Sequence, residues 1–243
     1  MNLGWEPIWR KHGARWELQE PHPRVVELVQ LLKKEGRSHS EGPEPARVHD
    51  LGCGLGRHLL LLAAEGFDTY GSDISPTAVE TCHRRLREAT LSATVTRNEM
   101  TDVPPPNGFL DAVIAWNVLY HATTEGILRA ISGVRDKLND GGYLLATFIS
   151  TDDGQYARSR ALLGDGRATE LEPDTFVIPG DTVLDKALPH HYSTEQEIRE
   201  SFLDGLDVVW LEEERREAVD FEGHAYPSVH WQVLARKEGS HER

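Results

Sequence analysis

The chain has 243 residues, enough to bury the core of an α/β domain, and its length predicts a single domain. Its formal net charge is −14 at pH 7 and it has no stripe of Lys and Arg, so we expect no nucleic-acid partner. No apolar stretch approaches the ~20 residues that cross a bilayer, which predicts no membrane partner. Residues 1–13 carry charge where a signal peptide has its apolar segment, so we expect a cytoplasmic protein.

Residues 1–22 form an N-terminal extension that is rich in tryptophan. Trp5, Trp9 and Trp16 fall on one side of a helical wheel, although Gly13 weakens a continuous helix. Two interpretations remain open: the tryptophans form a lid over a ligand and its substrate, or they only pack the extension onto the domain.

A helix is predicted over residues 23–32, where Val25, Leu28, Val29 and Leu32 recur at helical spacing. The polar segment 38–46 contains glycine and proline and predicts a linker to the first strand.

The segment VHDLGCGLGRH, residues 48–58, predicts a strand that turns tightly into a helix. Gly52, Gly54 and Gly56 supply the positive φ angles and the close ligand approach that such a turn needs. The amides at the start of the helix would face a ligand. Cys53 and Cys82 are too few for a disulfide framework, so we expect two reduced thiols and no metal site.

Three further strands each end in polar or aromatic residues. The segment 67–75 places Asp73 where a carboxylate can accept both hydroxyls of a ribose. Strand 93–97 leads to the segment NEMTDVP, and strand 109–116 leads to NVLYH. Ligands of open parallel sheets bind at these carboxyl ends.

Strands and helices alternate up to the strand at 141–150, with helices predicted at 55–65, 77–88 and 124–138. Alternation of this kind predicts an α/β fold with a doubly wound, mostly parallel sheet.

At this point the chain resembles the class I S-adenosylmethionine-dependent methyltransferases. Their motifs run acid-x-G-x-G-x-G, an acid closing strand 2, an acidic segment after strand 3 and a strand 4 of the form (F/L)D-x-(V/I), and all four occur here in order. The segments WNVLYH and HHYSTEQEI resemble small-molecule methyltransferases related to the tellurite-resistance group. The resemblance implies a Rossmann-like sheet of seven strands with an antiparallel C-terminal hairpin.

The resemblance also implies roles for individual residues. The three glycines of the turn would line the methionine and ribose of S-adenosylmethionine, with Asp50 near its amino group. Asp73 would bind the ribose. Residues expected around the adenine and the sulfonium are Ile74, Glu99, Met100 and Asn117.

Structural roles remain open for some of these residues. Asp50 could be an acid favoured by the helix dipole, and Asp73 could cap the helix that begins near Ser75. Met100 and Trp116 could equally belong to the core.

Residues 151–192 lack a clear period and form a long insertion, which we expect to lie on the substrate side of the cofactor-binding core at 23–150. The remainder, 193–243, begins with a Ser193-x-x-Gln196 capping box and a helix to Leu203, followed by strands at 207–214 and 228–237.

Histidines and tyrosines flank the expected acceptor side. We predict His121, His191 or Tyr192 as a general base if the acceptor is an amine or hydroxyl, because histidine titrates near neutral pH. Tyr120, Tyr156 and Arg158, with Trp9 and Trp16, are predicted to contact the substrate. For each of these, a role in packing or on the solvated surface remains open.

The leading hypothesis is a methyltransferase that acts on a small molecule by in-line displacement. The alternatives are a non-catalytic protein that senses the cofactor and an NAD-dependent oxidoreductase with Asp73 on the ribose. Dinucleotide sites normally show G-x-G-x-x-G instead of the G-x-G-x-G found here.

Overall fold

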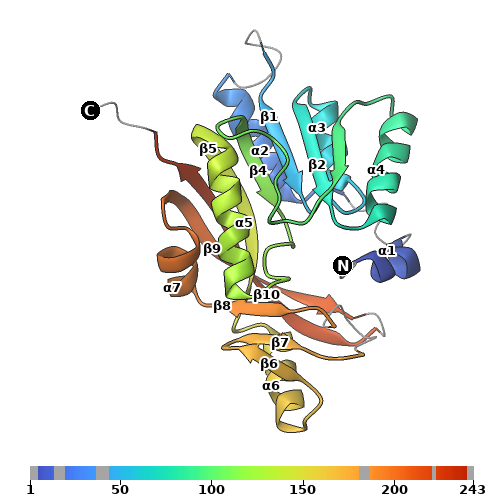
Figure 1. Ribbon diagram of the computed structural model, residues 1–243, viewed down its shortest axis with the longest axis vertical. Helices are drawn as coiled ribbons and strands as arrows, with labels where there is room; N and C mark the ends of the chain where they lie inside the picture. Colours follow the sequence, from blue (N-terminus) through green and yellow to red (C-terminus); the bar gives the residue numbers. More distant parts are fainter. Residues whose placement is uncertain (1–4, 14–19, 37–43, 181–186, 221–222, 240–243) are drawn as a thin grey trace.

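A computed structural model describes residues 5–13, 20–36, 44–180, 187–220 and 223–239 (Figure 1). The helices are α1 (Glu6–His12), α2 (Pro23–Lys34), α3 (Arg57–Ala64), α4 (Pro76–Glu88), α5 (Thr124–Lys137), α6 (Gly154–Gly164) and α7 (Glu195–Glu197), which continues as a π-helical turn over Ile198–Phe202. The strands are β1 (Arg47–Leu51), β2 (Asp68–Asp73), β3 (Thr94–Arg97), β4 (Leu110–Ala115), β5 (Leu138–Ser150), β6 (Thr169–Glu172), β7 (Thr175–Val177), β8 (His190–Ser193), β9 (Leu206–Val219) and β10 (Ala225–Lys237).

The main sheet has the order β3-β2-β1-β4-β5-β10-β9. The first five strands are parallel, and β10 lies antiparallel to both β5 and β9. The predicted doubly wound sheet with an antiparallel C-terminal hairpin is therefore confirmed. The carboxyl ends of β1, β2 and β4 meet at one edge, where the glycine turn and Asp73 lie.

Helices cover both faces of the sheet, and the central strand β4 shows why. Ala112 and Ile114 pack toward α2, whereas Val113 and Ala115 pack toward α5, and all four are fully buried. Because successive residues of a strand point to opposite faces, a strand covered on both faces is apolar throughout. In the described part of the chain, no helix is long and apolar enough to cross a membrane.

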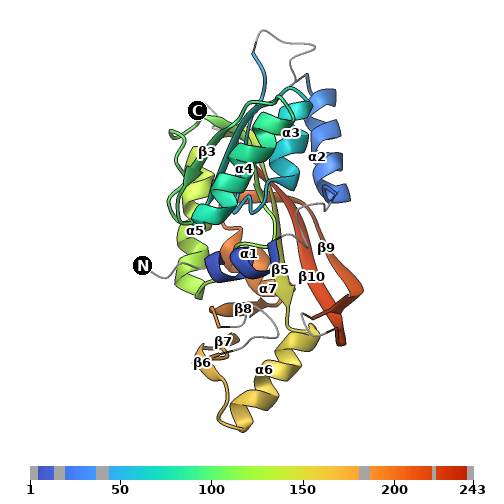
Figure 2. The same cartoon turned by 90° about the vertical axis from the view of Figure 1, so that its right-hand side faces the viewer.

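The insertion after β5 is more regular than the sequence predicts. It holds α6 and the short strands β6, β7 and β8, and Figure 2 shows α6 beyond the ends of the hairpin strands. Strand β8 pairs with β5 through Ile149 and Ser150, where β5 extends beyond its pairing with β4. Strands of three or four residues have too few positions to show a period, which is why the sequence did not reveal them.

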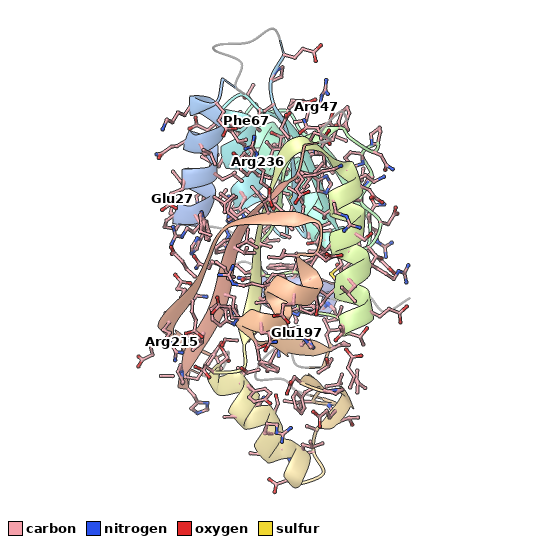
Figure 3. All side chains as sticks on the ribbon, turned by 90° about the vertical axis from the view of Figure 1, so that its left-hand side faces the viewer. Glu27, Arg47, Phe67, Glu197, Arg215 and Arg236 are labelled. Atoms are coloured by element: carbon pink, nitrogen blue, oxygen red, sulfur yellow. The ribbon has the colours of Figure 1, made fainter. Side chains whose placement is uncertain are left out.

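Two contacts join the insertion to the C-terminal hairpin. Both carboxylate oxygens of Asp153 are used: one accepts from the N–H of Gln155 and caps α6, and the other accepts from the N–H of Val229, each at 2.7 Å. At the surface, Arg215 of β9 contacts Asp152 at 2.6 Å and points outward (Figure 3).

The predicted capping box is wrong by one residue. Ser193 ends β8, and Thr194 is the N-cap, its hydroxyl accepting from the N–H of Glu197 at 3.2 Å. Glu197 itself lies on this short helix beside the insertion (Figure 3). The pairing of β8 with β5 holds Ser193 in the strand.

The contacts of Asp153 give a stability prediction. The variant Asp153→Ala leaves two buried N–H groups without their acceptor, and we expect a loss of about 2–3 kcal/mol in unfolding free energy. Chemical denaturation followed by circular dichroism measures it. The matched variant Asp152→Ala removes an exposed carboxylate and should cost less than about 0.5 kcal/mol. Equal losses for the two variants would contradict the structural role of Asp153.

Candidate active site

A cavity of about 710 Å³ opens at the carboxyl ends of β1, β2 and β4 and continues to the C-terminal hairpin. This volume falls in the range of small-molecule sites. Its walls come from the glycine turn, the segments after β2, β3 and β4, helix α1, the loop before β8 and the hairpin β9–β10.

The glycine turn forms the floor of the cavity. Gly52 and Gly54 both have positive φ and line it. A Cβ at Gly52 would lie 2.6 Å from the side chain of Val118, and a Cβ at Gly54 would lie 3.0 Å from the indole of Trp9. The third glycine, Gly56, is not among the lining residues; its Cβ would meet the Cys82 sulfur at 2.9 Å, so this position lets α3 pack against α4. The expectation that Gly56 lines the cofactor is corrected accordingly.

Asp73 is buried at the end of β2 and lines the same cavity. One carboxylate oxygen accepts from the N–H of Gly54 and the other from the N–H of Ser75, both at 2.9 Å. Burial raises the pKa of Asp73 to about 6, while the backbone hydrogen bonds oppose this rise. The N–H of Ile74 is a third backbone contact of this carboxylate. A carboxylate has about four acceptor positions, so capacity remains for a ligand hydroxyl.

Asp50 lies beneath the turn and outside the cavity lining. Its Oδ1 is 3.9 Å from Nδ1 of His58, and its Oδ2 is buried without a hydrogen-bond partner in the described part of the chain. Burial raises the pKa of Asp50 to about 7. The side chain of Asp50 therefore lies outside the cavity lining, and its contact with the cofactor amino group stays a prediction.

The remaining predicted cofactor residues come together in the cavity. Ile74, Glu99, Met100 and Asn117 all line it. Asn117 has a left-handed backbone, with φ of 58°, and its N–H donates to the Thr147 hydroxyl at 2.8 Å. The same hydroxyl donates to the Asn117 side-chain oxygen at 3.2 Å, which fixes the segment after β4.

Helix α1 covers one side of the cavity with Trp5 and Trp9. Its Glu6 is buried and accepts hydrogen bonds from the hydroxyls of Ser75 and Thr77, at the start of α4. The predicted substrate residue Trp16 lies outside the described residues.

The three predicted catalytic residues separate into two environments. His121 lines the cavity, with its ring 5.2 Å from that of Trp5. His191 is buried in β8, where its Nδ1 bonds to the Thr175 hydroxyl at 2.7 Å and its Nε2 to the Glu197 carboxylate at 3.0 Å. Its catalytic assignment is corrected, because both ring nitrogens serve contacts within the insertion and the adjoining helix.

The tyrosines and the arginine predicted at the site also lie outside the cavity lining. Tyr192 is fully buried in a cluster with Phe176 and Tyr120 and is not a base in contact with the cavity. Tyr156 donates to Asp174 at 2.6 Å, and Arg158 lies on the same helix, α6. The predictions for these residues are corrected because the insertion folds its own small core.

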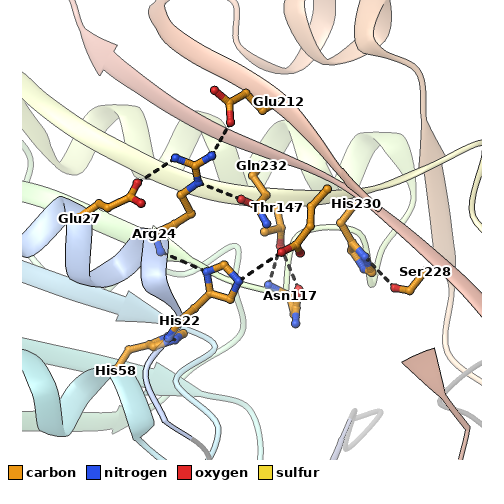
Figure 4. Close-up of polar contacts among 11 residues, drawn as sticks. His22, Arg24, Glu27, His58, Asn117, Thr147, Glu212, Ser228, His230 and Gln232 are labelled. Atoms are coloured by element: carbon orange, nitrogen blue, oxygen red, sulfur yellow. Dashed lines mark hydrogen bonds and ion pairs between the residues drawn. The ribbon is translucent and has the colours of Figure 1, made fainter. Parts of the chain in front are cut away.

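Several lining residues escaped prediction from the sequence. His22, at the start of α2, contacts Glu214 of β9, and Gln232 of β10 lies beside them (Figure 4). Arg57 and Arg216 line the same end. A sequence signal existed for Gln232, since it is polar in the otherwise apolar run of a buried strand.

The buried acid beneath the turn predicts a pH effect on stability. Because the pKa of Asp50 is raised in the folded chain, its contribution to stability is full below about pH 4 and is lost as the pH rises through about 7. The unfolding free energy of Asp50→Asn, relative to that of the native chain, should therefore rise by about 2 kcal/mol as the pH goes from 5 to 8. Comparison across pH cancels any pH-independent cost of the substitution.

Urea unfolding at the two pH values measures this gain, and Asp207→Asn, at an exposed position on β9, is the matched control. If the difference in unfolding free energy between Asp50→Asn and the native chain is the same at pH 5 and pH 8, the pKa of Asp50 is not raised.

The chain is similar to known methyltransferases. Residues 48–142 match a family model described as a methyltransferase domain. The chain is 26% identical over 142 residues to a probable S-adenosyl-L-methionine-dependent methyltransferase TehB of Haemophilus influenzae, covering 58% of this chain and 46% of the relative. It is 30% identical over 127 residues to a ribosomal RNA small subunit methyltransferase C of Alcanivorax borkumensis, covering 51% and 38%.

Among solved structures, the magnesium protoporphyrin IX methyltransferase of Synechocystis with bound S-adenosylhomocysteine (SAH) matches with a TM-score of 0.62 and 20% identity, covering 96% of each chain. This likeness shows the fold. The chain spans less than two thirds of the length of the curated relatives, from 38% to 62%. Residues 48–142 thus match a methyltransferase domain, and the chain is similar to S-adenosylmethionine-dependent methyltransferases, TehB among them.

Proposed function

We propose that this protein transfers the methyl group of S-adenosylmethionine to a small-molecule acceptor. The observation that carries the proposal is Asp73, a buried carboxylate with spare acceptor capacity that lies beside the glycine turn in the same cavity. The match of residues 48–142 to a methyltransferase domain supports this proposal, as does the similarity to the probable S-adenosyl-L-methionine-dependent methyltransferase TehB.

The lining residues suit the parts of the cofactor. Asp73 would accept hydrogen bonds from the ribose hydroxyls, and Ile74 and Met100 would flank the adenine, with Glu99 near its amino group. Asn117, held by Thr147, would lie near the sulfonium. The bound cofactor supplies an electrophilic methyl group, and the chain supplies position and a dry environment.

His121 is the predicted base that the structure keeps at the cavity, so we assign it the proton of an amine or hydroxyl acceptor. Trp5 and Trp9 would exclude water from the reacting atoms, which matters because sulfonium and nucleophile lose charge together. A thiolate acceptor would need no base.

The competing interpretations have less support. A dinucleotide-binding oxidoreductase normally shows G-x-G-x-x-G, and a non-catalytic sensor would not need the cavity beyond Asn117. The excess of acidic residues favours a small molecule over a nucleic acid as acceptor, and a cytoplasmic location stays a prediction from the composition.

The test is calorimetric titration with SAH and, separately, with NAD. We expect micromolar binding of SAH and none of NAD. Asp73→Asn should weaken SAH binding at least tenfold, because a neutral amide replaces the acceptor of the ribose hydroxyls. The control Asp68→Asn lies at the other end of β2 and should leave the affinity unchanged. Binding of NAD in place of SAH would overturn the proposal.

A further inference from the structure

The sheet order separates the cofactor side of the cavity from an opposite side. Asp73 follows β2 and Asn117 follows β4, whereas Gln232 of β10 lies opposite Thr147 of β5 in the strand register. A cofactor with its ribose on Asp73 and its sulfonium near Asn117 leaves the side formed by β5, β10 and β9 for the acceptor. This step rests on the proposed function.

Gln232 presents a hydrogen-bond donor on that side. Its Oε1 accepts from Nε of Arg24 at 3.2 Å, and because a guanidinium can only donate, the amide orientation is fixed. Its Nε2 is buried without a hydrogen-bond partner in the described part of the chain, and the residue is 3% exposed and lines the cavity. A buried donor without a partner destabilises the empty site, and a ligand oxygen that accepts from it would remove this cost.

The contacts of Arg24 hold this amide in place. Its guanidinium bonds to Glu27 at 2.8 Å and to the carboxylate of Glu212 (Figure 4). The guanidinium also lies over the Trp210 ring, 4.6 Å from its centroid. Three polar contacts and one stacked ring leave Arg24 little freedom, so Gln232 is oriented before any ligand arrives.

His22 supplies a second donor. Its Nδ1 accepts from the N–H of Arg24 at 3.3 Å, so the neutral ring carries its proton on Nε2. Burial lowers the pKa of His22, which favours this neutral form. The ring lies 4.1 Å from the ring of Trp116, tilted by 31° against it, and its Nε2 is 3.8 Å from the Glu214 carboxylate.

The charges at this end favour an anion. Arg57 and Arg216 line the cavity here together with the carboxylate of Glu214, and Arg57 also interacts with the buried Asp50 behind the lining. Arg24, by contrast, is paired with two acids. We propose that Gln232, His22, Arg57 and Arg216 form a donor subsite that binds the carboxylate of the methyl acceptor. The neighbouring rings of Trp5 and Trp116 suit an acceptor with an aromatic or apolar body.

The experiment uses the full chain saturated with SAH, titrated calorimetrically with benzoate and with its uncharged analogue benzamide. We expect benzoate to bind at least tenfold more tightly than benzamide. Gln232→Glu keeps an oxygen for Arg24 but removes the donor, and should weaken benzoate at least tenfold. The control Gln30→Glu makes the same charge change at an exposed position of α2 and should have no effect. Arg216→Gln, at an exposed position of β9, should also weaken the binding of benzoate.

A second titration separates the acceptor carboxylate from that of the cofactor. SAH carries a carboxylate and 5′-methylthioadenosine does not, and we expect Gln232→Glu to bind each as the native chain does. If the variant loses affinity for SAH alone, the subsite holds the cofactor carboxylate and the acceptor assignment is wrong.

The remaining outcomes are also decisive. Equal affinity for benzoate and benzamide, no binding of benzoate, or unchanged benzoate binding in Gln232→Glu would each overturn the donor subsite and leave the proposed function standing. Failure of the native chain to bind SAH would instead overturn the proposed function.

Discussion

The carboxylate of Asp73 connects the backbone segments that build the cofactor side of the cavity. It accepts one N–H from the glycine turn after β1 and one from Ser75 at the start of α4. Ser75 also caps α4 and donates to Glu6 of the covering helix α1. One buried carboxylate thus sets the position of the turn, of helix α4 and, through Ser75, of the two tryptophans above the cavity.

This arrangement costs stability. Asp73 and Asp50 are both buried near the same turn, and burial raises the pKa of each, to about 6 and about 7. Neighbouring charge adds to the rise, since Asp73 raises the pKa of Asp50. Acids with strongly raised pKa values concentrate at functional sites, where the chain keeps charges that a purely structural core would avoid. A positively charged ligand in the cavity would offset part of this cost.

The sequence predicts that these residues meet at one edge of the sheet, because the signals for this edge are local. Gly52 and Gly54 form one turn, Asp73 ends the next strand, and parallel strands bring their carboxyl ends together. His191 and Tyr192 could not be placed in this way. They lie on a four-residue strand between β5 and β7, and such a strand has no period to show that both side chains are buried.

The acceptor side depends on contacts between distant parts of the chain. Arg24 and Gln232 are 208 residues apart and meet because β10 inserts between β5 and β9, beside the start of α2. In the sequence, His22 precedes a proline, and this pattern predicts at most an N-cap. His22 does cap α2. Its second role, toward the cavity, follows from the sheet order and has no local signal.

A crystal structure of the protein with SAH would test the central claim most directly. We expect the ribose hydroxyls within hydrogen-bond distance of the Asp73 carboxylate, the adenine beside Ile74 and Met100, and the sulfur near Asn117. The side toward Gln232 should stay free for an acceptor. A ligand that leaves Asp73 without contact, or whose adenine lies beside Gln232, would contradict it.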